Sequence, residues 1–276
     1  MKRTIFLLTA MLCSSLWAEV TQTFNAKLVR TDRKAFRVVL EDCDEVQLTY
    51  KLENGRESKI LPVAEVDNVQ IQLPKLSLDE LQARLVAAEY GDVVSVLEPV
   101  VGNAGKYMIV PNNIVPVFAL LTKAYLRNGD IAKARSAAEQ LQVVSDPEIK
   151  REAQSIIAEC IVESGDLEEA KKRVAKLEDS AARLYLTARI QRDEKQSKEA
   201  MQTIVELIAS HPNDHNWMPQ AEYLCAQLYL DLGMPDSAAE VARQTVTLYP
   251  GSEFKIEAQK LQEEINQKTE ASGQAE

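Results

Sequence analysis

Two histidines and four cysteines are the side chains of this chain best suited to metal binding or nucleophilic catalysis. His211 and His215 lie four residues apart with Asp214 between them, and on a helix this spacing places two ligands on one face. Pro212 and Asn213 fall inside the same segment, and both residue types favour a turn or loop. The segment therefore predicts a solvated loop between helices, with a metal site as the alternative.

The cysteines form no recognisable site. Cys160 and Cys225 fall on apolar stretches of expected helices, where a free thiol packs as a small hydrophobic group. Cys43 lies in a polar turn and is expected to be the most exposed thiol, either free or paired with another chain. The sequence has no C-x-x-C pair and none of the common phosphate-binding, hydrolase or zinc-protease motifs. We therefore predict a non-enzymatic protein without catalytic, cofactor-binding or metal-binding residues.

The first eighteen residues have the pattern of a secretory signal peptide. Lys2 and Arg3 are basic, residues 5–16 are mostly apolar, and Ala18 is a small residue at a plausible cleavage point before Glu19. The alternative is an uncleaved N-terminal anchor. No later stretch is apolar enough to cross a bilayer. For a bacterial source, this pattern predicts an exported protein, either periplasmic or secreted.

Composition indicates a soluble protein with an acidic surface. The 276 residues are 46% hydrophobic, 27% charged and only 5% aromatic, so packing must rely on small aliphatic side chains. The formal charge is −10, and removal of Lys2 and Arg3 with the signal peptide makes it −12. This charge argues against nucleic acid and anionic membranes as partners. Loss of Cys13 leaves three cysteines, an odd number that does not suit a disulfide framework.

Residues 19–74 are expected to form a small β domain. Four segments carry β-branched and aromatic residues in partial alternation, and polar turns separate them. Asn54-Gly55 is the strongest hairpin signal, because both residues tolerate a positive φ. The pattern predicts a meander or an SH3-like or Sm-like barrel, and it leaves barrel and open sheet undecided. The expected strands are residues 24–30, 36–40, 46–52 and 63–73.

Residues 77–268 have helical periodicity, and residues 269–276 form a polar tail that is expected to be disordered. Ser77 and Glu80 fit a capping box at the first helix. Residues 102–116 interrupt the pattern with glycines and prolines around an apolar core. They are either a functional insertion or a segment whose apolar residues pack between repeats. The expected helix pairs are 78–89 with 92–101, 116–127 with 130–143, 147–163 with 166–176, 179–192 with 197–210, and 219–232 with 235–247, followed by a single helix over 252–266.

A recurring frame connects these pairs. A helix ends at Asn128-Gly129-Asp130 and the next begins at once, with Gly suited to a positive φ and Asp to an N-cap. Small residues let the second helix of each pair approach the first closely. Four such alanines are separated by 36, 30 and 38 residues. The positions expected to pack the repeats are Leu121, Tyr125, Gly129, Ala134, Gly165, Ala170, Ala200, Ala226, Tyr229, Gly233 and Ala238.

This frame resembles the tetratricopeptide (TPR) repeat, a helix pair of about 34 residues. The resemblance implies an α-solenoid that binds a protein or peptide on its concave face, which the first helices line. The matching positions are packing positions, so no binding residue can be transferred from the family. We therefore expect a scaffold for protein–protein or protein–peptide interaction. Two alternatives are a structural component of an envelope or outer-membrane assembly and a metal-dependent enzyme that uses His211 or His215.

Overall fold

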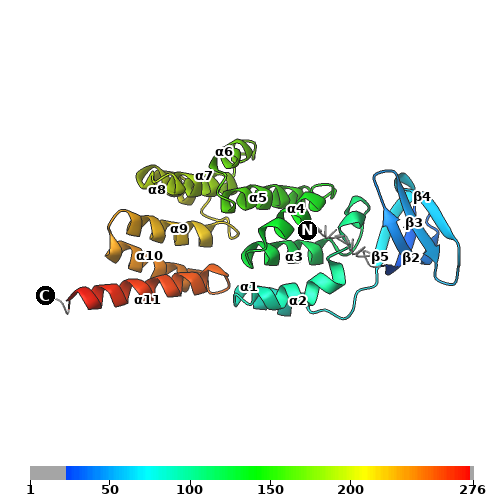
Figure 1. Cartoon of the computed structure of the whole chain (residues 1–276), viewed down its shortest axis with the longest axis horizontal. Coiled ribbons are helices and arrows are strands. Elements are labelled where there is room, and N and C mark those ends of the chain that lie inside the picture. The colour runs from blue at the N-terminus through cyan, green and yellow to red at the C-terminus, as the bar shows by residue number, and fades with distance from the viewer. Residues whose placement is uncertain (1–22, 274–276) are drawn as a thin grey trace, which may run out of the picture.

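The protein is described by a computed structural model in which residues 23–273 are placed, with side chains as far as residue 267. The expected signal peptide lies outside the described residues. A five-stranded antiparallel sheet precedes a long array of helices (Figure 1), so the predicted fold class is confirmed. The sheet occupies one end of the molecule, and the helices stack away from it.

Strands β4 and β5 are the two edge strands of the sheet, although they follow one another in the sequence. The 3₁₀ turn between them is only three residues long, so the sheet must curl to bring its edges near each other. Leu28, Leu40, Leu48 and Val69 point into this curl and are fully buried. The order is β4-β3-β2-β1-β5, and the strands are β1 Phe24–Arg30, β2 Ala35–Cys43, β3 Gln47–Leu52, β4 Ser58–Pro62 and β5 Val66–Ile71.

Two details of the sheet differ from the prediction. Strand β4 was not expected, because as an edge strand it buries only Leu61 and shows no clear alternation. The β3–β4 connection runs from Glu53 to Glu57, longer than the two-residue turn that Asn54-Gly55 favours. Gly55 is not among the residues with positive φ. The Asn-Gly pair therefore marks the turn without forming the expected type.

Helices in the described part of the chain form five hairpins and a final long helix. Ser77 caps α1 as predicted, because its side chain accepts a hydrogen bond from the Glu80 amide. The last helix extends beyond residue 269, where the sequence predicted a disordered tail. The hairpins are α1 Leu78–Val86 with α2 Tyr90–Val101, α3 Val115–Arg127 with α4 Ile131–Leu141, α5 Pro147–Glu163 with α6 Leu167–Val174, α7 Ala181–Asp193 with α8 Ser197–Ser210, and α9 Met218–Asp231 with α10 Pro235–Leu248, before α11 Phe254–Gly273.

Each hairpin turns through one residue with a positive φ. The sequence prediction holds for Gly129, Gly165 and Gly233, whose φ angles are 83°, 78° and 76°. In the other two hairpins the same place is taken by Ala88 and Lys195, with φ angles of 60° and 65°. The break expected between helices 78–89 and 92–101 is therefore misplaced, because the chain turns at Ala88 and α2 begins at Tyr90. The turn of each hairpin is thus a backbone conformation that glycine favours but that other residues also adopt.

Residues 102–116 fasten the sheet to the helices. Their 3₁₀ helix, η2 (Gly105–Ile109), contacts both β2 and α4. Tyr107 is fully buried, with its ring 5.7 Å from that of Phe24. Asn113 receives a hydrogen bond of 2.7 Å from the Ile71 amide and donates one of 3.0 Å to the Ile71 carbonyl. The apolar residues of this segment thus pack between the sheet and the first repeats.

Candidate binding groove

A cavity of about 820 Å³ lies on the inner side of the helical array. Its helical walls come from the first helices of the hairpins, α1, α3, α5, α7 and α9, together with the last residue of α10 and the first of α11. The α6–α7, α8–α9 and α10–α11 connections complete the lining. First helices therefore supply most of the helical lining. We refer to this cavity as the groove.

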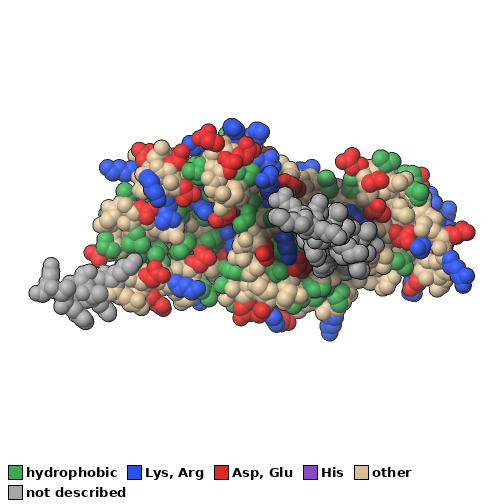
Figure 2. Space-filling model, viewed as in Figure 1, with side chains coloured by type: hydrophobic (Ala, Val, Ile, Leu, Met, Phe, Trp, Pro, Cys, Tyr) green, Lys and Arg blue, Asp and Glu red, His purple; other side chains and the backbone are tan. Residues whose placement is uncertain are grey.

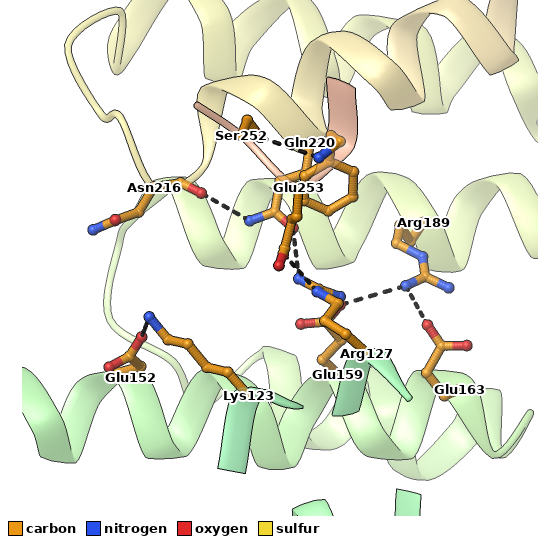
Figure 3. A network of polar contacts seen from close by, with 11 residues as sticks. Lys123, Arg127, Glu152, Glu159, Glu163, Arg189, Asn216, Gln220, Ser252 and Glu253 are labelled. Carbon is orange, nitrogen blue, oxygen red and sulfur yellow. Dashed lines mark hydrogen bonds and ion pairs between the residues drawn. The ribbon is translucent and has the colours of Figure 1, made fainter. Parts of the chain in front are cut away.

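A buried ion-pair network crosses the base of the groove (Figure 3). The Arg127 guanidinium donates to Glu159 and to Glu253, both at 2.7 Å. The side chain of Glu159 is only 3% exposed, and Arg127 compensates the cost of burying its negative charge. Burial opposes the charge of Arg127, but Glu159 and Glu253 outweigh it and raise its pKa well above the usual value. Arg127 is therefore charged at neutral pH.

A second cation completes the network. Arg189 on α7 contacts Glu163 at 2.7 Å and Glu159 at 3.8 Å (Figure 3). Burial again opposes its charge, yet its pKa is raised by Tyr185 and by the two glutamates. Glu159 therefore stands between two arginines from different hairpins. The network joins α3, α5, α7 and the segment before α11, and it fixes how these elements face one another.

Aromatic and aliphatic side chains also contribute to the lining. Trp217, at the start of α9, lies with its ring 5.4 Å from that of Tyr185. The Arg127 guanidinium lies over the Phe254 ring, 5.1 Å from its centroid, and makes a cation–π contact with it. Leu248 lines the groove and is 60% exposed, although it is a large apolar side chain. The groove thus offers apolar contact area between fixed charges, which is typical of a ligand-binding surface.

Carboxylates outnumber cations in this lining. The cations among the lining residues are Lys123, Arg127 and Arg151. On the face of the molecule seen in Figure 2, acidic and basic side chains are mixed over the helices. The excess of carboxylates in the groove has the same sign as the charge of the whole chain, which has 42 acidic and 32 basic residues. The acidic residues of the lining are Glu148, Glu152, Glu159, Glu178, Asp214 and Glu253.

The predicted repeat-packing residues lie outside the groove lining and inside the helix pairs. Leu121, Ala134 and Ala170 are fully buried, as are Ala200, Ala226 and Ala238. Tyr125 is 5% exposed and Tyr229 packs partly buried against the core. Gly129, Gly165 and Gly233 are the turn residues described above. Asp130 does not cap its helix with its side chain, which instead accepts a hydrogen bond from Asn128.

Both histidines lie in the connection between α8 and α9. His211 is the C-cap residue of α8, and His215 lies further along the loop and lines the groove, whereas His211 does not. Among the described residues, no group of three His, Cys, Asp or Glu side chains is arranged to hold a metal ion. The loop predicted between helices is present at this position, between α8 and α9.

Cys43 does not lie in an exposed polar turn, as predicted, but ends strand β2 and is buried, with 8% of the residue exposed. It is still slightly more exposed than Cys160 and Cys225. Strand β2 continues three residues past its expected end, and its register with β3 shifts between Leu40 and Asp42. Such a bulge reverses the side of the sheet to which later side chains point. Cys43 therefore turns inward, and burial raises the pKa of its thiol to about 11.

The network around Arg127 was not anticipated from the sequence. One signal was present: Glu159 stands inside the apolar run from Ile156 to Val162, where a charge needs a buried partner. Its partners come from positions 127 and 189, and no local pattern connects these to it. A charged residue on the buried face of a predicted helix is thus the feature that could have located the groove.

Comparison with known proteins gives matches of fold only. No family model matches the chain, and no curated protein matches it. A tetratricopeptide repeat protein from Parabacteroides merdae is 15% identical with a TM-score of 0.42, covering 66% of this chain and 70% of that one. A structure of TPR-like repeats from Podosopora anserina is 20% identical with a TM-score of 0.37, covering 58% and 87%. Yeast Tom70 is 15% identical with a TM-score of 0.38, covering 70% and 39%.

Proposed function

We propose that this chain is an exported, non-enzymatic scaffold of the cell envelope that holds an extended segment of a partner protein in its groove. The observation that carries the proposal is the groove itself, a cavity of about 820 Å³ lined by the first helices of the hairpins. This volume lies within the range of ligand-binding pockets. Helix-pair arrays commonly use such concave surfaces for binding.

The chemistry of the lining favours binding over catalysis. Its most buried charges, Arg127 and Glu159, are committed to each other at 2.7 Å. The thiols of Cys160 and Cys225 are buried outside the lining, and burial raises their pKa values to about 12 and about 11. A nucleophilic cysteine needs the opposite shift. The fixed charges therefore set the shape of the groove and its preference for a partner.

Placement in the envelope is supported by the leader sequence of residues 1–18, with its basic start and apolar run. Among the described residues, no helix is long and apolar enough to cross a membrane. N-terminal sequencing of the protein recovered from the envelope fraction tests the location. A mature start at Glu19 is the expected result, and recovery of the intact leader in the cytoplasmic fraction would refute it.

Site-specific photo-crosslinking in living cells tests the binding role. A photoreactive residue is introduced at Gln82 on α1 or Gln154 on α5, both of which line the groove. The matched control is Gln202, which is exposed on α8 outside the lining. We expect one partner protein to crosslink at both groove positions and not at Gln202. Crosslinking that is equal at all three positions would remove the groove as the binding surface.

A further inference from the structure

We infer that the groove selects a basic partner segment, an extended peptide with Lys or Arg side chains next to apolar ones. This inference rests on the proposed function and adds the chemical class of the partner. It follows from a comparison of the charged residues of the lining that already form ion pairs with those that do not.

Every cation of the lining already has an acidic neighbour. Lys123 lies 2.6 Å from Glu152, and Arg127 is shared by Glu159 and Glu253. Arg151, which is more exposed, approaches Glu148 at 4.0 Å. An acidic ligand would have to displace one of these carboxylates before it could form an ion pair. The cations of the groove are therefore poorly placed to recruit one.

Two carboxylates of the lining have no ion pair among the described contacts. Glu178 is exposed in the connection before α7, and Asp214 lies in the connection before α9. Asp214 accepts hydrogen bonds from the amides of Asn216 and Trp217 at 3.1 and 3.2 Å. These bonds fix its position but leave its negative charge without a cation. Both loops thus present a carboxylate to anything that enters the groove.

Trp217 provides a second contact suited to a cation. It follows Asp214 by three residues, its amide is held by that carboxylate, and its side chain is half-buried in the groove lining. An aromatic face beside a carboxylate is a favourable site for an ammonium or guanidinium group. The exposed Leu248 supplies apolar surface in the same lining, which the buried Leu85 and Leu126 support. The complementary ligand therefore alternates basic and aliphatic side chains.

Peptide binding to the full chain carrying Trp17→Phe tests the inference, because Trp217 is then the only tryptophan. Three probe peptides of about nine residues, roughly 30 Å when extended, repeat Lys-Leu-Ser, Gln-Leu-Ser or Glu-Leu-Ser. We expect the Lys peptide to bind most tightly and to change the emission of Trp217. Its affinity should fall as NaCl is raised from about 0.05 M to about 0.5 M, because salt screens exposed charges.

Charge-neutral variants locate the effect. Glu178→Gln combined with Asp214→Asn keeps the shape of both side chains, and Asn retains the oxygen that accepts the loop amides. We expect about a five- to tenfold loss of affinity for the Lys peptide. The control is Glu57→Gln with Asp67→Asn, which removes the same charge from exposed positions of the sheet domain. The control variant should bind the Lys peptide as tightly as the parent protein does.

Three outcomes would overturn the inference: the Gln or Glu peptide binds as tightly as the Lys peptide, the control variant loses as much affinity, or no peptide binds at low salt. The proposed function is judged separately by crosslinking at Gln82 and Gln154. Groove crosslinks to a neutral or acidic segment would refute the basic class and leave the function standing. Absence of groove crosslinks would refute both.

Discussion

Arg127 at the end of α3 and Glu253 just before α11 lie 2.7 Å apart, although 126 positions separate them in the chain. In most solenoids each repeat contacts only its neighbours. Here the second hairpin is linked directly to the segment before the last helix, and Phe254 reinforces the contact. The curvature of the array is thus fixed by a contact across the groove as well as by packing between adjacent helices.

Replacement of Arg127 by Leu should therefore destabilise the protein strongly. It leaves the buried carboxylate of Glu159 with only Arg189, at 3.8 Å. Loss of one member of a buried ion pair typically costs about 3–5 kcal/mol. Urea unfolding followed by circular dichroism measures the change. The double variant Arg127→Leu with Glu159→Leu should recover much of the loss, because no uncompensated charge remains.

The control for this prediction is Arg243→Gln. Arg243 pairs with Glu240 at 2.6 Å, but both side chains are half exposed on α10. Exposed ion pairs contribute little to stability. No measurable shift of the urea midpoint is expected. If Arg127→Leu unfolds at the same midpoint as this control, the network is not a structural element of the groove.

The positive-φ residues of the hairpins predict that adding a Cβ atom there destabilises the protein and that removing one does not. Gly165→Ala should cost about 1 kcal/mol, because its φ of 78° is unfavourable for a residue with a Cβ atom. No atom lies within 4 Å of a Cβ built there, so the cost is backbone strain alone. Lys195→Gly, at a φ of 65°, should be neutral or slightly stabilising.

Gln202→Gly provides the comparison for the hairpin turns. Gln202 is exposed in the middle of α8, where Gly is disfavoured by about 1 kcal/mol. In thermal unfolding, Lys195→Gly should have a higher melting temperature than Gly165→Ala and Gln202→Gly. A Lys195→Gly variant as unstable as Gln202→Gly would show that the turn conformation carries no strain.

Local patterns were enough to predict the strand-rich start, the helix pairs and three of the five turn residues. Glycine identified those three turns, whereas Ala88 and Lys195 adopt the same backbone because α1–α2 and α7–α8 packing imposes it. The inward turn of Cys43 depends on a bulge between two strands, which no single-strand pattern reveals. The groove depends on Arg127 meeting Glu253 through the curvature of the whole array. Such long-range contacts have no signature in local sequence.

Asn113 should govern how firmly the sheet domain is attached. Its side-chain amide makes two hydrogen bonds to the backbone of Ile71, as a neighbouring strand would. Asn113→Ala removes both and should cost roughly 1–2 kcal/mol. Hydrogen exchange of the Ile71 amide should become faster. Asn103→Ala, an exposed change in the same segment, should leave that amide as protected as in the parent.

Glu222 on α9 predicts a pH dependence of stability. Burial raises the pKa of its carboxyl above the ordinary 4.5, although the Tyr249 hydroxyl donates a hydrogen bond to it and favours ionisation. Its other carboxylate oxygen, Oε2, is buried without a hydrogen-bond partner. Because the folded state favours the protonated form, ionisation of Glu222 lowers stability as the pH rises through the range between its unfolded and folded pKa values.

Glu222→Gln should therefore raise the melting temperature near pH 7.5. The glutamine amide is neutral, so no charge has to be held in this half-buried position. The gain should vanish below about pH 4, where the carboxyl is protonated in both the folded and unfolded states. Scanning calorimetry at the two pH values measures the difference. Glu206→Gln, an exposed change on α8, should show no such dependence on pH. An equal gain from Glu222→Gln at both pH values would mean that packing, and not ionisation, limits stability at this position.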